Sequence, residues 1–362
     1  MNRTRKVLPS VLLIMIISLL LSCAGLPVDK SDSGTAVTLQ SQPDWVLNLQ
    51  SMFPSDDWLA ARGQGMTRET ARNDALNQIA LLFRTDINGL TRTQELLQNI
   101  TIETQSNKNS NVTSALRKSE QDITAGSNIS GLIGLQFEEW TARDGSIYVC
   151  AYLNKKESAA RYKAIINEND GIISSLIEKA NAKPASFESY SELQAALKLA
   201  EITDNYYSML IVLDAGEAAG KPQYGSYQAI KTLFDANAKA IVINIDVQDD
   251  DGGRIKTAFG NFFTQKGFKT GNTDINTLYI FTVHTEFTNV EYNDNTQYQW
   301  LRYTLRAELS DNAKKSLFHH AENGREGHLT KTEVKMRVLN TIEESIHKGN
   351  FANEFNLWLS SL

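Results

Sequence analysis

The chain has 362 residues, of which 41% are hydrophobic, so it is long and apolar enough for two or three domains with cores of their own. Its formal net charge is −6, and this acidic balance argues against nucleic acid or anionic lipid as the main partner. Only two cysteines are present, which excludes a disulfide-rich fold.

The first residues have the order of an export signal. Arg3, Arg5 and Lys6 form a basic start, and a mostly apolar run follows over residues 11–21. A membrane-spanning helix needs about 20 apolar residues, roughly twice the length of this run. The pattern therefore predicts a secretory signal and not a transmembrane anchor.

The apolar run ends at residues 20–23 (Leu-Leu-Ser-Cys), which resemble the lipobox of bacterial lipoproteins. In that family of signals the Cys thiol takes a diacylglyceryl group and becomes the new N-terminus after cleavage. The resemblance implies a signal peptide over residues 1–22 and lipidation of Cys23, with palmitate-type acyl chains as the membrane anchor. The alternative is an ordinary signal peptide in which Cys23 is incidental. No Asp follows the cysteine, which favours the periplasmic face of an outer membrane.

The second cysteine is expected to be structural. Removal of the signal lowers the formal charge from −6 to −9, and acylation of Cys23 leaves Cys150 without a partner for an intramolecular disulfide. Cys150 lies in residues 147–152, an apolar run that predicts a strand. We expect its thiol to be a small buried group, because no His before residue 284 is available to activate it.

After the signal, residues 23–42 are polar and rich in Ser, Thr and Gly, and they predict a flexible tether with a reach of roughly 25 Å. An α+β domain is predicted over residues 43–155. It contains a glycine-ended strand over residues 58–65 and an alanine-periodic helix capped by Thr67. A hairpin is predicted over residues 135–153 because apolar and polar residues alternate on both sides of an Arg-Asp-Gly turn.

In the rest of the chain, the spacing of the apolar residues changes twice. Residues 156–238 follow helical spacing with a break at Lys183-Pro184, and they predict a helical hairpin or small bundle without a period-34 repeat. It is open whether residues 206–213 continue the second helix or form a third. Residues 239–362 predict a β-α-β-β-β-α domain whose last strand is short and includes Leu317 and Phe318, followed by a final helix over residues 334–346. The fold class is therefore α+β.

Three features of the first domain together resemble the Lpp-twenty-type bacterial lipoprotein family. They are Pro43-Asp44-Trp45-Val46, the glycine-ended strand 60–65 before its helix, and the hairpin that joins residues 138–140 to residues 148–151. The resemblance covers about residues 43–160, and this family is similar to the amino-terminal domain of the flagellar assembly protein FlgT. It implies a cell-envelope lipoprotein that works by protein contact, and it carries no catalytic residues. The polar segment 101–127 departs from the pattern.

Two polar clusters contain residue types that can bind metal ions. Asp249, Asp250, Asp251 and Gly252 lack the alternating ligands of a Ca²⁺ loop, so a solvated turn that caps the next helix is expected instead. The other cluster consists of His319, His320 and His328. Adjacent residues of a strand point to opposite faces, so His319 and His320 are not expected to share an ion. We expect no metal and no cofactor.

The tryptophans Trp45, Trp58 and Trp140 suit either core packing or a partner-binding patch. Together these features predict a lipid-anchored, non-enzymatic binding or assembly module with an envelope protein as partner and no nucleic acid. The alternative is an accessory or activator subunit of an envelope machine, such as a cell-wall synthase, a secretion pore or a flagellar structure. The segment Gly324-Arg325-Glu326-Gly327 before the last helix loosely resembles such accessory lipoproteins. A hydrolase with an unrecognised site is the least favoured class, because no known hydrolase motif is present.

Overall fold

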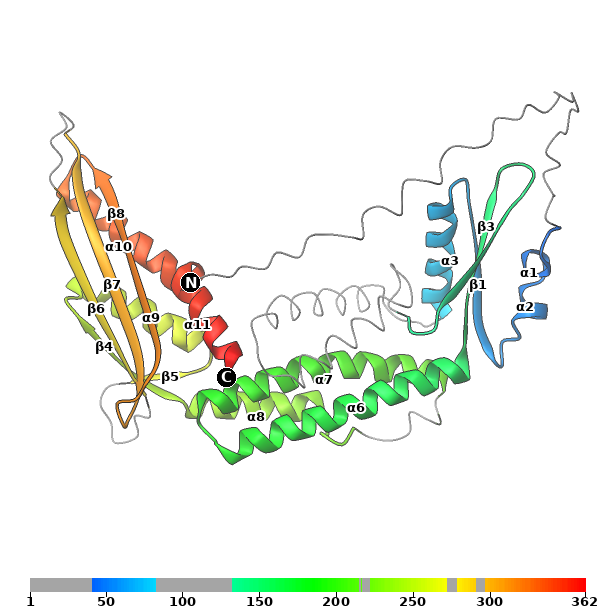
Figure 1. Cartoon of the computed structure of the whole chain (residues 1–362), viewed down its shortest axis with the longest axis horizontal. Coiled ribbons are helices and arrows are strands. Elements are labelled where there is room, and N and C mark those ends of the chain that lie inside the picture. Colours follow the sequence, from blue (N-terminus) through cyan, green and yellow to red (C-terminus); the bar gives the residue numbers. More distant parts are fainter. Residues whose placement is uncertain (1–40, 83–131, 215, 217–221, 272–278, 291–296) are drawn as a thin grey trace, which may run out of the picture. The chain divides into compact units, whose positions relative to one another are not determined.

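The computed structural model describes residues 41–82, 132–214, 216, 222–271, 279–290 and 297–362, and it has the predicted α+β fold (Figure 1). The lipidation site Cys23, the signal peptide and almost all of the tether lie outside these residues. Among the described helices, none combines the length and the apolar character that crossing a membrane requires.

The first domain is built on a three-stranded antiparallel sheet of order β1-β3-β2. The hairpin β2–β3 confirms the prediction, and Gly145 supplies the positive φ (+85°) that its turn needs. Two short helices precede the sheet and one long helix follows β1. The elements are α1 (Asp44–Leu47), α2 (Leu49–Met52), β1 (Trp58–Gly65), α3 (Arg68–Leu82), β2 (Gln136–Thr141) and β3 (Ile147–Asn154).

Helix α3 lies directly against β1 because the strand has glycines at the contact. A Cβ atom on Gly63 would lie 2.2 Å from the Ala71 carbonyl oxygen and 2.2 Å from the Ala75 nitrogen. The start of α3 is fixed as predicted, since the Thr70 N–H donates to Thr67 Oγ1 at 3.2 Å. Small residues on both elements therefore set the distance between helix and sheet.

The middle segment consists of three helices, α6 (Lys155–Ala182), α7 (Phe187–Leu213) and α8 (Tyr227–Ala240). Helix α6 begins directly after β3, and Asn154 Oδ1 caps it by accepting from the Glu157 N–H at 2.9 Å. The predicted break at Lys183-Pro184 is confirmed, and residues 206–213 prove to be the continuation of α7.

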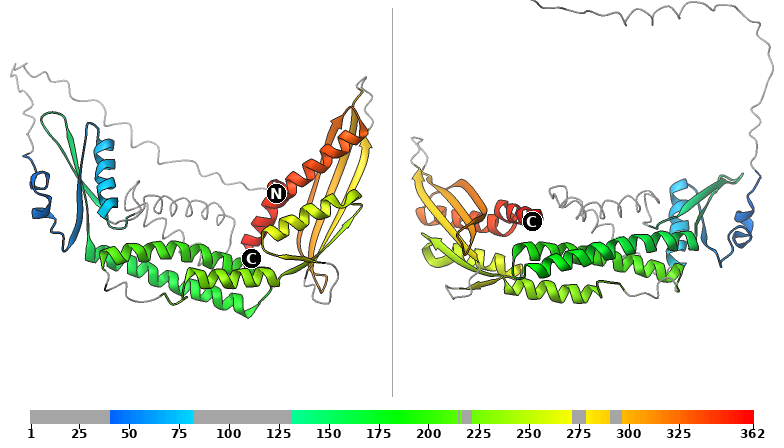
Figure 2. Two further views of the ribbon diagram at one scale, coloured as in Figure 1. Left: turned by 180° about the vertical axis from the view of Figure 1, so that it is seen from behind. Right: turned by 60° about the horizontal axis from the view of Figure 1, so that its bottom comes forward.

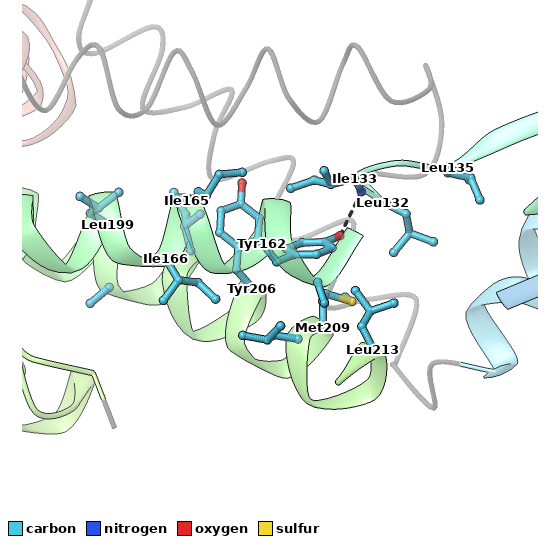
Figure 3. Packing of buried hydrophobic residues seen from close by; sticks show 14 of the residues in the cluster. Leu132, Ile133, Leu135, Tyr162, Ile165, Ile166, Leu199, Tyr206, Met209 and Leu213 are labelled. Carbon is cyan, nitrogen blue, oxygen red and sulfur yellow. Dashed lines mark hydrogen bonds between the residues drawn. The ribbon is translucent and has the colours of Figure 1, made fainter. Parts of the chain in front are cut away.

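One buried cluster runs from the first sheet along the α6–α7 hairpin. Figure 3 shows Tyr162, Ile166, Tyr206 and Met209 packed between these helices. The Tyr162 hydroxyl accepts a hydrogen bond from the Ile133 N–H at 3.0 Å, so the residues that lead into β2 are tied to α6. The deeply buried Tyr162 hydroxyl therefore has a hydrogen-bond partner.

The C-terminal unit is a five-stranded mixed sheet of order β5-β4-β6-β7-β8, in which β4 pairs in parallel with β5 and β6. Helices α9, α10 and α11 cover one face of it (Figure 2). Its elements are β4 (Val242–Gln248), the short helix η2 (Asp251–Gly253), α9 (Arg254–Gln265), β5 (Lys269–Gly271), β6 (Tyr279–Val290), β7 (Gln299–Asp311), β8 (Ser316–His328), α10 (Lys331–Lys348) and α11 (Asn350–Ser361).

This unit differs from its prediction in three elements. Strand β8 is long and not short, the edge strand β5 was missed, and a further helix, α11, follows α10 after Gly349. The predicted strand is too short because Gly324 and Gly327 interrupt its sequence pattern. In the structure, rings of the adjacent strand cover both glycines: Tyr303 lies over Gly324, and Trp300 lies over Gly327. An aromatic ring on the adjacent strand can replace the packing that a glycine lacks.

Candidate functional site

The face of the first sheet that points away from α3 is aromatic. Alternation along β3 places Tyr148, Cys150 and Tyr152 on this face, and Trp140 of β2 lies opposite Tyr148. Ring centroids are 5.7 Å apart between Trp140 and Tyr148. Phe53, which follows α2, stacks on Tyr152 at 4.4 Å. We call the side chains of Trp58, Trp140, Tyr148 and Tyr152 the aromatic face.

The three predicted tryptophans all belong to this region but differ in exposure. Trp45 is only 2% exposed and packs with Val46 and Phe53 against Cys150. Trp58 and Trp140 are half-buried and pack around the same cluster. Of the three tryptophans, only Trp58 and Trp140 can therefore contribute to a surface for a partner, and the use of that surface as a binding patch stays a prediction.

The thiol at the centre of this cluster is structural, as expected. Cys150 is fully buried, and burial together with the nearby Glu138 carboxylate raises the pKa of its thiol to about 12. A thiol with so high a pKa is almost entirely protonated at neutral pH and is a poor nucleophile. Cys150 therefore contributes packing and not chemistry.

Polar groups hold the rim of the aromatic face. The Tyr152 hydroxyl donates to Glu138 Oε1 at 3.3 Å, and burial, helped by that carboxylate, raises the pKa of Tyr152. The Arg62 guanidinium donates to the Val46 carbonyl oxygen, which ties β1 to helix α1. Half-buried rings with polar partners at their edges are typical of protein contact surfaces.

A second polar cluster lies on the α6–α7 hairpin. Asp170 Oδ2 accepts from the Gln223 N–H at 3.3 Å and from the Tyr207 hydroxyl at 3.5 Å. The Tyr224 hydroxyl donates to Asp204 Oδ1 at 2.8 Å. Burial raises the pKa of the Asp170 carboxyl. These contacts hold the residues before α8 against the hairpin, which is a structural role.

The histidine cluster is divided between the two faces of β8, as the alternation predicts. His319 is exposed, whereas His320 is buried under α10 and α11. Within the described ranges, no three His, Cys, Asp or Glu side chains are close enough to hold a metal ion. The aspartate turn caps α9, because Asp250 accepts from the N–H groups of Ile255 at 3.1 Å and Lys256 at 2.8 Å.

A cavity of about 490 Å³ lies beside the start of α6. Lysines and aspartates both line it, and the Lys155 ammonium donates to the Ser55 carbonyl oxygen at 2.6 Å. The mixed charges give the cavity no clear preference for an anion or a cation. Its charged lining residues are Asp56, Asp57, Lys155, Lys156, Lys163 and Asp214.

Comparisons with known proteins return weak structural likenesses. No family model and no curated protein matches the chain. The secreted protein HP1454 from Helicobacter pylori is similar with a TM-score of 0.39 and 12% identity, over 80% of this chain and 97% of that one. A minor lipoprotein from Acinetobacter baumannii is similar with a TM-score of 0.22 and 12% identity, over 34% of this chain and 91% of that one.

Both TM-scores lie below 0.5, so no function is transferred from these two proteins. Neither comparison involves a flagellar assembly protein. The resemblance to the Lpp-twenty-type family therefore stays a prediction.

Proposed function

We propose that this protein is a lipid-anchored envelope lipoprotein that acts as a non-enzymatic binding or assembly module. The observation that supports this proposal is the N-terminal sequence. A basic start is followed by an apolar run, and the run ends at Leu20, Leu21, Ser22 and Cys23. Two or three acyl chains on one cysteine hold a protein stably at a bilayer, whereas a single chain does so only marginally. The polar tether then lets the folded domains reach partners at a raised effective concentration.

The anchor is tested with Cys23→Ser. We expect the wild-type chain to incorporate an alkyne-labelled fatty acid and to partition into the detergent phase of Triton X-114, while Cys23→Ser loses the label and moves to the aqueous phase. Cys150→Ala is the matched control, because it removes the other cysteine and should keep both label and partitioning. A Cys23→Ser protein that keeps the label would exclude the proposed anchor.

The aromatic face is the binding surface that the geometry supports best. Its Trp and Tyr rings are already ordered by their mutual contacts, so little side-chain entropy is lost when a partner covers them. Trp and Tyr are also the residues that most often carry binding energy at protein interfaces. We therefore assign the envelope protein partner to this face.

Site-specific photo-crosslinking in intact cells tests this assignment. A benzoylphenylalanine at position 140 or 58 is expected to give the same discrete adduct, because both positions belong to the aromatic face. The control position is Leu357 on α11, which is 49% exposed and lies outside the aromatic face. Equal adducts from all three positions, or none from 140 and 58, would contradict the assignment. A component of a larger envelope machine in the adduct would identify the protein as an accessory subunit.

A further inference from the structure

A buried histidine connects three elements of the C-terminal unit. The His320 side chain is 1% exposed and points from β8 toward the helices. Its Nδ1 lies 2.7 Å from Glu354 Oε2 of α11, at hydrogen-bond distance, and its Nε2 lies 3.4 Å from Glu322 Oε2 of β8, an ion-pair contact without the geometry of a hydrogen bond. The imidazole is therefore placed between two carboxylates, each facing a different ring nitrogen.

The carboxylate of Glu322 depends on His320 for a neighbouring positive charge. Its side chain is 8% exposed, and Oε2 also accepts from the Ser345 hydroxyl of α10 at 2.6 Å. Its Oε1 is buried without a hydrogen-bond partner in the described structure. Across the same described ranges, neither Glu322 nor Glu354 forms an ion pair with a Lys or Arg. The protonated His320 is thus their source of positive charge, and a buried carboxylate without one is costly.

The groups that face His320 come from every element packed on it. Its own strand contributes Glu322, α11 contributes Glu354 and the Phe351 ring, and α10 contributes the neutral hydroxyl of Ser345, which donates to Glu322. The cross-strand neighbour on β7 is the apolar Ala307. Two acids and no second base therefore surround the imidazole.

Helix α11 is the element that this histidine holds in place. Its Phe355 and Trp358 pack on Phe318 of β8, with ring centroids 5.2 and 5.5 Å away. Trp358 also lies 5.2 Å from Phe187, the first residue of α7. Helix α11 therefore joins the sheet of the C-terminal unit to the start of α7.

We propose that protonated His320 acts as a pH-sensitive clamp that holds α11 on the sheet and that releases it when the proton is lost. A neutral imidazole has one N–H and no positive charge, so it can keep the hydrogen bond to Glu354 but not the ion pair with Glu322. Deprotonation therefore leaves the buried Glu322 carboxylate without its positively charged neighbour. The helix that bridges the sheet and α7 then opens more often.

The direction of the pH dependence follows from the site. Burial lowers the pKa of His320, but the adjacent Glu322 and Glu354 carboxylates, the second of which is hydrogen-bonded to Nδ1, outweigh it and raise the pKa above the usual value. A raised pKa in the folded state means that the clamp is complete below about pH 6.5, the usual value for an unfolded histidine. Its contribution is lost as the pH rises through the folded-state pKa. The clamp operates whether or not Cys23 is acylated.

Hydrogen–deuterium exchange of the full chain tests the clamp. After correction for intrinsic exchange rates, protection of residues 350–361 is expected to fall at least about tenfold between pH 6 and pH 9, whereas residues 279–290 of β6 stay protected. His320→Gln should remove the pH dependence. His319→Gln is the matched control, because it removes the adjacent but exposed histidine and should behave as the wild type does.

Glu354→Gln provides a second variant if His320→Gln does not fold, since the Glu354 side chain is 54% exposed. It should reduce the pH dependence without preventing folding. Protection of α11 that does not change with pH in the wild type would overturn the proposal. So would a pH dependence that survives in His320→Gln or disappears in His319→Gln.

Discussion

Gly63→Ala is expected to destabilise the first domain by about 3 kcal/mol or more, which is a large share of the stability of a small domain. The new Cβ atom would lie 2.2 Å from the Ala71 carbonyl oxygen and from the Ala75 nitrogen, which are backbone atoms of α3. No rotamer change can remove this overlap, so the helix must move away from β1. That movement opens the core around Ile79. Urea denaturation followed by circular dichroism measures the loss.

Gly171→Ala is the matched control for this substitution. Gly171 lies in the middle of α6, is exposed, and has no atom within 4 Å of the position that a Cβ would occupy. An alanine there should stabilise the protein by about 0.5–1 kcal/mol, because glycine loses more backbone entropy in a helix. If Gly63→Ala proved as harmless as Gly171→Ala, the proposed role of the strand glycines in helix packing would be wrong.

Much of the fold could be predicted from local chemistry. Thr67 at the start of α3, the alternation around the Arg-Asp-Gly turn, and the break at Lys183-Pro184 act within a few residues, so the sequence shows them directly. The same holds for the aspartate turn, whose carboxylate caps α9 six residues or fewer along the chain. Such local signals can be recognised without knowing which segments pack against each other in the fold.

The rest depends on contacts between distant residues. Strand β8 has charged or polar residues at inward positions, such as His320 and Glu322, so it lacks the apolar alternation that marks a half-buried strand. Such inward charges protect an edge strand from pairing with other chains. The partner of His320, Glu354, lies 34 residues away on a helix that was not predicted. Nothing local distinguishes His320 from His319 except the alternation.

The burial of Trp45 also depends on distant residues. Its position in the sequence suits a surface patch as well as a core, and the choice is made by Cys150 and Phe53, which pack against it. The two half-buried tryptophans that remain, Trp58 and Trp140, are placed on the same face by the register of β1, β3 and β2, but on the two outer strands and toward opposite ends of β3. Sequence reasoning could name these residues but could not rank their exposure.

Phe351→Ala is expected to destabilise the C-terminal unit by about 3–5 kcal/mol, the range found when a buried Phe is truncated. Phe351 is fully buried in α11, and its ring contacts a cluster of aromatic rings from both layers. The centroids of Phe259, Phe262, Phe281, Phe318 and Phe355 lie 4.9 to 5.9 Å away. Truncation of Phe351 leaves a cavity, and the surrounding rings have little freedom to move and fill it. Calorimetry of the purified chain measures the fall in stability.

Leu357→Ala on the same helix is the control, because Leu357 is 49% exposed and should change the stability by less than about 0.5 kcal/mol. A large loss from Phe351→Ala with little change from Leu357→Ala would show that α11 is an integral part of the core. In that case the clamp at His320 does not decide whether α11 folds, because the aromatic cluster does so. The clamp adds a pH-dependent part to that stability and sets how often an already packed helix opens, which is why hydrogen exchange of α11 is its most direct readout.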